Sequence, residues 1–104
     1  MSVTIEHREQ SPQTALITVN GRLLLGPGCQ EMERLIGGLL EQGYRHLTID
    51  VAGVTHIDST GMGRFIDAHN KLQPLGGSVH VVGAKGAVRD MFRVTRLDTI
   101  FRFD

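Results

Sequence analysis

The stretch HIDSTGMG, residues 56–63, lies where an apolar strand is expected to give way to a helix. It follows the β-forming run LTIDV, residues 47–51, and a helical pattern extends from it over residues 59–73. Asp58 and Ser59 are residue types favoured at a helix N-cap, and two glycines keep the first turn free of bulky side chains. The stretch therefore predicts a loop that exposes a helix N-terminus, with Ser59 reachable from solvent.

Strands and helices are expected to alternate on both sides of this loop. The expected strands are residues 3–8, 15–20, 47–51, 79–82 and 99–103, and the expected helices are one opened by Pro27 and capped by Gly43, one over 59–73 and one over 84–94. From residue 15 onward this alternation predicts right-handed crossovers between parallel strands, while the turn SPQT predicts an antiparallel N-terminal hairpin. The predicted fold is a single α/β domain over residues 1–104, with a mixed, mostly parallel sheet of four to five strands packed with helices.

The apolar residues of the three predicted helices recur at spacings of three and four, so each helix has one face for the core. The predicted core residues are Met32, Leu35, Ile36, Leu39 and Leu40 in the first helix, Met62, Phe65, Ile66 and Leu72 in the second, and Val88, Met91 and Phe92 in the third. A chain of 104 residues is of a size that makes one compact domain around such a core.

The composition excludes several classes of protein. The single cysteine, Cys29, excludes an internal disulfide framework. Its place beside a predicted helix start allows a lowered thiol pKa, but a lone cysteine there is more often a small packing residue, and we favour that interpretation. The formal net charge of zero gives no electrostatic ground for direct nucleic-acid binding. No apolar run approaches the roughly 20 residues of a membrane span, and the N-terminus lacks a signal-peptide pattern. We therefore expect a cytoplasmic protein with no membrane insertion.

Histidines and basic residues elsewhere point to no defined site. The five histidines match no metal-binding spacing, so neither a metal ion nor a cofactor is expected: His7, His46, His56, His69 and His80. A basic stripe along the third predicted helix favours a solvated outer face over an acidic partner or nucleic acid. Its residues are Lys85, Arg89, Arg93 and Arg96.

Ser59 allows four interpretations from the residues alone. A helix start by itself accounts for Asp-Ser-Thr, since all three types are favoured there. A nucleophilic serine would need a base, and the nearby His56 lies in a stretch without the G-x-S-x-G elbow. A phosphate cradle would need a Gly-rich loop ending in Lys and Ser or Thr, which STGMGR lacks. The fourth interpretation is that Ser59 is phosphorylated, which adds about −1.5 to −2 charges to the surface at the helix start.

The stretch VTHIDSTGMGRFIDAHNKLQPLGGSVHVVGAKGAVRDMFRVTRLDTIF, residues 54–101, resembles the STAS domain of bacterial anti-sigma factor antagonists, whose signature is an Asp-Ser-Ser/Thr-Gly-Leu-Gly loop at a helix start. The first half of the chain follows the family's order of elements, so the resemblance covers essentially the whole chain. Met62 stands where the family usually has Leu, a change that conserves volume. The segment GRLLLGPG, residues 21–28, departs more, since the family tends to carry acidic residues there.

The resemblance implies a binding module that is not an enzyme and has no catalytic residue or cofactor of its own. Ser59 would be phosphorylated by an anti-sigma factor that is also a serine kinase using ATP. The unphosphorylated protein would bind this kinase and release a sigma factor to activate transcription, and a phosphatase would reset the cycle. Asp58 would help to position Ser59. The implied partner-binding surface consists of Asp58, Ser59, Thr60, Gly61, Met62 and Gly63.

Two other functions stay open at this point. A STAS domain can be a scaffold subunit of a transporter-associated or stressosome-type complex in which Ser59 is never modified. The chain can also be a small enzyme or nucleotide-binding domain, and hydrolysis of ATP or self-phosphorylation without a partner kinase would favour that function.

Overall fold

The computed structural model describes residues 3–104. Its strands and α-helices are β1 (Val3–Ser11), β2 (Thr14–Leu23), α1 (Pro27–Glu41), β3 (His46–Ile57), α2 (Ser59–Leu72), β4 (Ser78–Val82), α3 (Gly86–Val94) and β5 (Arg102–Phe103). Two short 3₁₀ helices, η1 (Gln73–Leu75) and η2 (Leu97–Thr99), follow α2 and α3. None of the helices in this part of the chain has the length and apolar character needed to cross a membrane.

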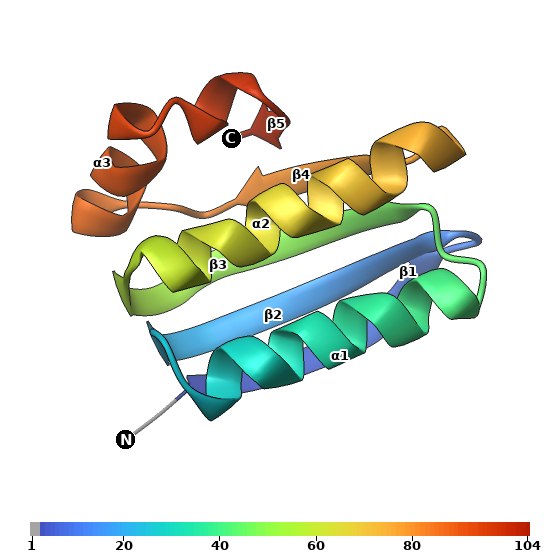
Figure 1. Cartoon of the computed structure of the whole chain (residues 1–104), viewed down its shortest axis with the longest axis horizontal. Coiled ribbons are helices and arrows are strands. Elements are labelled where there is room, and N and C mark those ends of the chain that lie inside the picture. The colour runs from blue at the N-terminus through green and yellow to red at the C-terminus, as the bar shows by residue number, and fades with distance from the viewer. Residues whose placement is uncertain (1–2) are drawn as a thin grey trace.

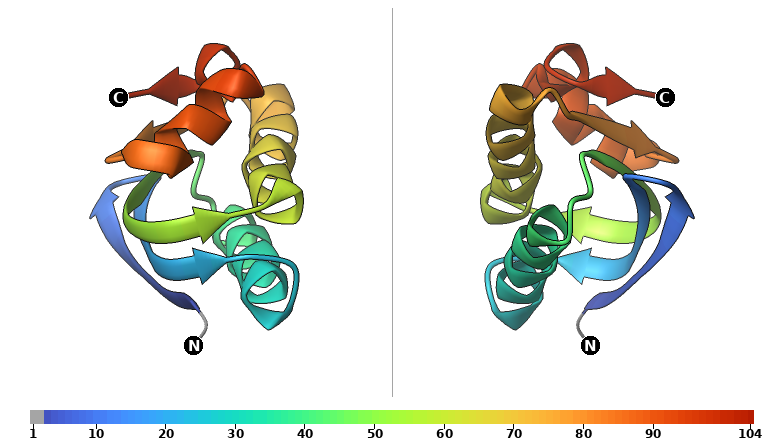
Figure 2. Two further views of the ribbon diagram at one scale, coloured as in Figure 1. Left: turned by 90° about the vertical axis from the view of Figure 1, so that its left-hand side faces the viewer. Right: turned by 90° about the vertical axis from the view of Figure 1, so that its right-hand side faces the viewer.

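The strands form one five-stranded sheet in the order β1-β2-β3-β4-β5. β1 pairs with β2 in antiparallel fashion, and the other neighbouring pairs are parallel. α1 and α2 lie side by side against one face of the sheet, and α3 packs near the C-terminal end of β3 (Figures 1 and 2). The predicted fold class, a mixed and mostly parallel sheet with an antiparallel N-terminal hairpin, is confirmed.

The two central strands supply the sheet side of the core. In β2 every second residue from Ala15 to Val19 is buried, and β3 repeats this alternation from Leu47 to Val51. Alternate residues of a strand point to one face, so these side chains all meet the helices. A slip of either strand by one residue would expose the whole set, and this fixes the register.

Proline and glycine delimit α1 as the sequence predicts. Pro27 is its first residue, and Gly43 follows its C-terminal end with a positive φ of 99°. The N–H groups of Gly43 and Tyr44 donate to the carbonyl oxygens of Leu40 and Leu39, each at 3.1 Å. This pair of hydrogen bonds is a Schellman motif, which satisfies carbonyl groups left free at the helix end. The predicted cap at Gly43 is confirmed.

The core face of α2 differs from the prediction at one position. Ile66, which is predicted to face the core, is 36% exposed, and Ala68 is buried instead. The buried face follows Phe65, Ala68 and Leu72 at spacings of three and four. Ile66 lies about 100° around the helix from Phe65, which places it outside this face.

The C-terminal elements also differ from the predictions. α3 begins at Gly86 rather than Ala84, because Lys85 has an extended backbone with φ −150° and ψ 162°. The strand predicted over residues 99–103 is reduced to the two residues of β5, because the 3₁₀ helix η2 occupies the start of that segment. Met91, predicted to face inward, is partly buried and packs against the core. Local patterns therefore place these elements correctly but not their boundaries.

The four phenylalanines of the chain join α2, α3 and the C-terminal segment. Phe92 of α3 is central, with its ring centroid 5.2 Å from that of Phe65, 5.1 Å from Phe103 and 6.3 Å from Phe101. The Phe65 and Phe92 rings meet at 80°, the edge-to-face geometry that aromatic pairs prefer. These contacts hold α3 against the rest of the domain.

We expect Phe65→Ala to lower the free energy of unfolding by about 3–5 kcal/mol, because it removes a fully buried ring and leaves a cavity against Phe92. The neighbouring change Ile66→Ala should cost no more than about 1 kcal/mol, since that side chain is partly in solvent. Urea unfolding followed by circular dichroism measures both variants. Equal losses would contradict the orientation of α2 described above.

Candidate functional site

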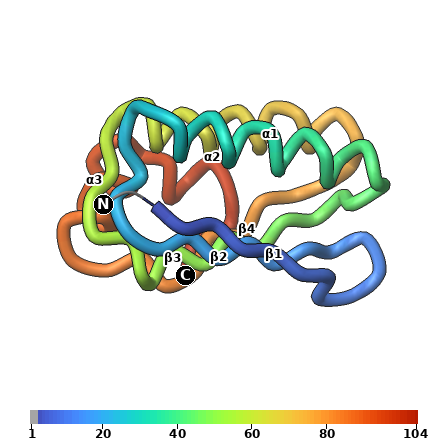
Figure 3. Tube along the Cα trace, turned by 90° about the horizontal axis from the view of Figure 1, so that it is seen from below, coloured from blue at the N-terminus to red at the C-terminus, as the bar shows by residue number. Residues whose placement is uncertain are grey.

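Ser59 lies at the end of the molecule where β2 and β3 end and α1 and α2 begin. These loops and α3 share one end of the domain (Figures 1 and 3). In a parallel sheet the C-terminal ends of the strands and the N-termini of the following helices meet at the same edge. Ser59 is the first residue of α2 and is exposed. The predicted exposure of Ser59 at a helix N-terminus is therefore confirmed.

Asp58 is the N-cap of α2 and ties this helix to the loop before α1. Its Oδ1 accepts a hydrogen bond from the N–H of Gly61 at 2.8 Å, and its Oδ2 accepts one from the N–H of Leu25 at 2.8 Å. These backbone donors, Gly61 first and then Leu25, stabilise the carboxylate and hold the pKa of Asp58 below its ordinary value of 3.8. One side chain thus fixes both the loop and the first turn of the helix.

The two glycines that follow Ser59 have different roles. A Cβ atom on Gly61 would lie 2.4 Å from the carbonyl oxygen of Leu23 and 2.9 Å from Cγ1 of Ile57. A Cβ atom on Gly63 would meet no atom within 4 Å. Gly61 is therefore required by the close packing of α2 on the end of β2, whereas Gly63 leaves open space one turn after Ser59.

The six residues of the predicted partner surface are contiguous but not equally accessible. Ser59 is exposed, whereas Gly61 and Met62 are buried, Met62 with 3% exposure. The other three are partly buried. Met62 belongs to the core face of α2, so in this structure it supports the loop from inside and does not face solvent.

Arg64 joins α2 to α1 behind the loop. Its guanidinium contacts Oε1 of Glu33 on α1 at 3.1 Å and Oδ2 of Asp67 on α2 at 3.0 Å. The Arg64 side chain is 19% exposed, but the Glu33 and Asp67 side chains are 52% and 46% exposed, so solvent still screens both ion pairs. Its Nε is buried and has no hydrogen-bond partner within residues 3–104. The spacing of residues along α2 cannot predict that Arg64 links the two helices, because its partner Glu33 lies on α1.

Cys29 is buried at the start of α1, and its thiol donates to the carbonyl oxygen of Leu24 at 3.1 Å. Burial first, and then the negative charge of Asp58, raise the pKa of the Cys29 thiol, while Arg64 lowers it to a smaller extent. The interpretation of a lowered thiol pKa is therefore wrong. The favoured interpretation, a packing residue, is confirmed.

An apolar hollow of about 210 Å³ borders the Ser59 loop. It is lined by Leu24, Thr55, His56, Ile57, Ala87, Val88 and Met91. The residue after Leu24, Leu25, projects into solvent with 78% exposure. The sequence does contain a signal for this apolar surface. The run of three leucines at residues 23–25 extends beyond the end of β2 at Leu23, so its last two residues lie outside the sheet. Sequence reasoning did not assign these residues to the site.

The hydrogen bonds near Ser59 do not assemble an activated nucleophile. Nδ1 of His56 shares a hydrogen bond with Oγ1 of Thr55 at 2.9 Å, and within the described chain no hydrogen bond links the Ser59 side chain to a histidine. In the same residues, no group of three or more His, Cys, Asp or Glu side chains is arranged to hold a metal ion. Within the described residues the Ser59 hydroxyl therefore has no hydrogen-bonded histidine to act as its base.

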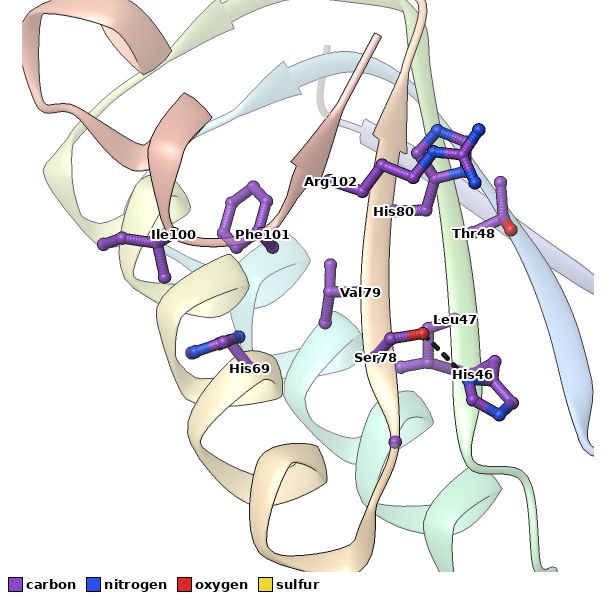
Figure 4. Close-up of a pocket in the computed structure, with 11 residues that line it drawn as sticks. His46, Leu47, Thr48, His69, Ser78, Val79, His80, Ile100, Phe101 and Arg102 are labelled. Carbon is purple, nitrogen blue, oxygen red and sulfur yellow. Dashed lines mark hydrogen bonds between the residues drawn. The ribbon is translucent and has the colours of Figure 1, made fainter.

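A larger cavity, of about 350 Å³, lies at the opposite end of α2, β3 and β4 (Figure 4). Among its lining residues are His46, His69 and His80. His46 shares a hydrogen bond with Ser78 Oγ at 2.8 Å, and His80 contacts Oδ2 of Asp104 at 2.6 Å. Because this cavity lies at the start of β3 and the Ser59 loop follows the end of β3, the two sites are separate.

The family model for the STAS domain matches residues 7–104, which is nearly the whole chain. The anti-sigma-B factor antagonist of Staphylococcus aureus is 24% identical over 67 residues, and the match spans 64% of this chain and 62% of that protein. The chain thus covers less than two thirds of the length of this relative.

Two solved structures share the fold. An anti-sigma factor antagonist from Mycobacterium paratuberculosis superposes with a TM-score of 0.81 at 24% identity, covering 98% of this chain and 85% of that one. The Bacillus cell fate determinant SpoIIAA in its phosphorylated form superposes with a TM-score of 0.79 at 16% identity, covering 97% and 91%. At these identities the likeness establishes the fold, and function must be argued from the site.

Asp58→Asn keeps only one acceptor oxygen for two backbone donors, so we expect a loss of about 1–2 kcal/mol in unfolding free energy at neutral pH. Because the pKa of Asp58 is lowered in the fold, its contribution is present above the unfolded carboxyl pKa and is lost as the pH falls through the folded value. Urea unfolding at about pH 7 and about pH 3 should show a gap between wild type and variant that shrinks in acid. A difference in unfolding free energy that is the same at both pH values would show that the negative charge of Asp58 does not stabilise the fold.

Gly61→Ala should destabilise the domain by at least about 2 kcal/mol, because the new methyl group would overlap the Leu23 carbonyl oxygen. Gly63→Ala, the matched control, should be neutral or stabilising by up to about 1 kcal/mol, since alanine has the higher helix propensity and meets open space. Thermal unfolding distinguishes the two. A Gly63→Ala variant that is the less stable of the pair would show that the packing of this loop is described wrongly.

Proposed function

The chain belongs to the STAS domain family, and we propose that it is an anti-sigma factor antagonist controlled by phosphorylation of Ser59. In its unphosphorylated form it binds an anti-sigma factor that is also a serine kinase, and this binding releases a sigma factor to activate transcription. The observation that carries the proposal is an exposed serine at the first position of α2, directly after the Asp58 cap.

Ser59 is the hydroxyl in this loop that a kinase can reach. Its neighbour Thr60 is partly buried, and the open space at Gly63 leaves the approach to Ser59 free. In the proposed reaction Oγ of Ser59 forms a bond to the γ-phosphorus of ATP, ADP leaves, and the hydroxyl proton passes to a base of the kinase. All catalytic groups belong to the partner, so this chain is its protein substrate.

The phosphorylated domain should stay folded. A dianion at the first position of a helix lies near free N–H groups and the positive end of the helix dipole, which stabilise a negative charge by about 0.3–1 kcal/mol. The N–H of Gly61 is already bonded to Asp58, so the phosphate has no need to displace the cap. The phosphorylated form of SpoIIAA, whose fold matches this chain, fits that expectation.

The same charge should weaken the complex with the kinase. Phosphate on Ser59 sits beside the carboxylate of Asp58, and both must lose water when a partner covers them. Like charges placed together in an interface cost several kcal/mol, and a loss of about 3 kcal/mol weakens binding roughly 150-fold. Phosphorylation therefore acts through desolvation and repulsion at the surface, without a change of fold.

The proposed cycle assigns the remaining steps to other proteins. A phosphatase removes the phosphate and restores the binding form, and the cycle runs in the cytoplasm on one domain spanning residues 1–104. The partner surface comprises the exposed and partly buried members of the predicted set, while Gly61 and Met62 act by shaping the loop. The other function considered, a scaffold subunit, differs in one testable respect, since its Ser59 is never modified.

The test uses the kinase captured from the source cells with Ser59→Ala as bait and identified by mass spectrometry. We expect Ser59→Ala to bind this kinase as tightly as wild type and to escape phosphorylation, whereas Ser59→Asp should bind at least about tenfold more weakly. Calorimetric titration measures the affinities, and incubation with ATP followed by mass spectrometry locates the phosphate.

Ser78→Asp is the matched control, because Ser78 is an exposed serine in the cavity at the far end of the domain. It should leave kinase binding unchanged. Wild-type protein that carries no phosphate on Ser59 after incubation with the captured partner would favour the scaffold function. Hydrolysis of ATP by the purified chain alone would instead favour an enzyme.

A further inference from the structure

Two exposed apolar side chains stand out at the Ser59 end of the domain. Among residues 3–104, the most exposed large apolar side chains are Val94 at 80% and Leu25 at 78%. Leu25 lies in the loop before α1, and Val94 is the last residue of α3. Isolated apolar residues are common on protein surfaces. Leu25 and Val94 are therefore of interest only if other apolar side chains join them into one continuous surface.

Leu25 lines a neighbouring hollow of about 180 Å³, and Leu24 lines both that one and the apolar hollow beside the Ser59 loop. Ala87 and Met91 line the hollow beside the Ser59 loop from α3. Residues 87, 91 and 94 recur at spacings of four and three, so Val94 continues the same face of α3 by one turn. We call this surface the apolar patch; it consists of Leu24, Leu25, Ala87, Met91 and Val94.

The apolar patch lies close to Ser59. The N–H of Leu25 donates to Oδ2 of Asp58 at 2.8 Å, and Asp58 directly precedes Ser59 in the chain. The path from the Leu25 nitrogen to the Ser59 Cα atom consists of one hydrogen bond, the Asp58 side chain and one Cα–Cα step. These lengths place the two atoms within about 10 Å of each other. His56 and Ile57, which also line the hollow, precede Ser59 by three and two residues.

We propose that the apolar patch is the docking contact for the serine kinase that modifies Ser59, with Leu25 as its main anchor; this rests on the function proposed above. A specific interface buries about 800 Å² on each partner, which corresponds to a disc of about 16 Å radius. A kinase interface of this size that is centred on Ser59 therefore covers Leu25. Its own surface beside the bound ATP is then apolar where it meets this residue.

Leu25 is held in position before a partner arrives. Its N–H is bonded to Asp58, and the next residue, Gly26, has a φ of 144°, a backbone conformation that L side chains rarely adopt. Pro27 then fixes the first turn of α1. The backbone of such an ordered loop loses little conformational freedom on binding, which favours affinity.

The apolar patch also strengthens the effect of phosphorylation. Where the partner surface matches the apolar side chains of the patch, it has no need of cations and offers no countercharge at the border of the patch. Covering the patch removes water from its border, where a phosphate on Ser59 would lie. The contact that provides affinity for the unphosphorylated form thus makes the phosphorylated form costly to bind.

The test compares Leu25→Asn with Leu75→Asn. Leu75 is also an exposed leucine, at 50%, but it lies beyond the C-terminal end of α2, and asparagine adds no charge at either site. With the purified kinase that phosphorylates Ser59, we expect Leu25→Asn to raise the Kd and the KM for phosphorylation at least about tenfold with kcat unchanged. Leu75→Asn should alter none of these, and both variants should keep the wild-type thermal midpoint.

The outcomes separate this inference from the proposed function. If no partner kinase phosphorylates wild-type Ser59, the proposed function fails and the docking contact fails with it. If the kinase modifies wild type and Leu25→Asn with the same KM, the docking contact is overturned while the function stands. Wild-type dimers that Leu25→Asn abolishes, seen by sedimentation, would assign the patch to a second copy of the chain and overturn the proposal.

Discussion

A single carboxylate organises the end of the domain that carries Ser59. Asp58 accepts the N–H of Gly61 within α2 and the N–H of Leu25 in the loop before α1, each at 2.8 Å. Backbone donors at a helix N-terminus have no intrahelical partner, so the cap satisfies a group that would otherwise depend on water. Because both segments are bonded to the same side chain, one interaction sets the position of the Ser59 hydroxyl and the projection of Leu25.

This interaction is possible only because α2 begins very close to the end of β2. The absence of a side chain at Gly61 allows that approach, since a Cβ atom there would overlap the Leu23 carbonyl oxygen. Behind the loop, Arg64 holds α2 to α1 through Glu33, and on the other side Phe92 holds α3 against the domain. The loop is therefore ordered by packing from three directions while the first residue of α2 remains exposed.

Local signals were sufficient to predict the order of the elements, the mixed sheet and the exposure of Ser59 at a helix start, because each depends on periodicity or on capping chemistry within a few residues. What could not be predicted depends on neighbours distant in the chain. The burial of Ala68 in place of Ile66 reflects how α2 rolls against the sheet, and the raised pKa of the Cys29 thiol reflects burial that outweighs the helix start. The role of Arg64 depends on a partner in another helix.

The proposed switch works because the fold and the complex respond to the same charge in opposite ways. A dianion at the start of α2 is favourable to the domain by about 0.3–1 kcal/mol, yet within a covered interface it is unfavourable by several kcal/mol. A complex of micromolar affinity is held by about 8 kcal/mol, so such a penalty is enough to dissociate it. The formal net charge of zero leaves the chain little long-range attraction for a partner. Affinity must then come from short-range contacts around Ser59, where one added phosphate has its largest effect.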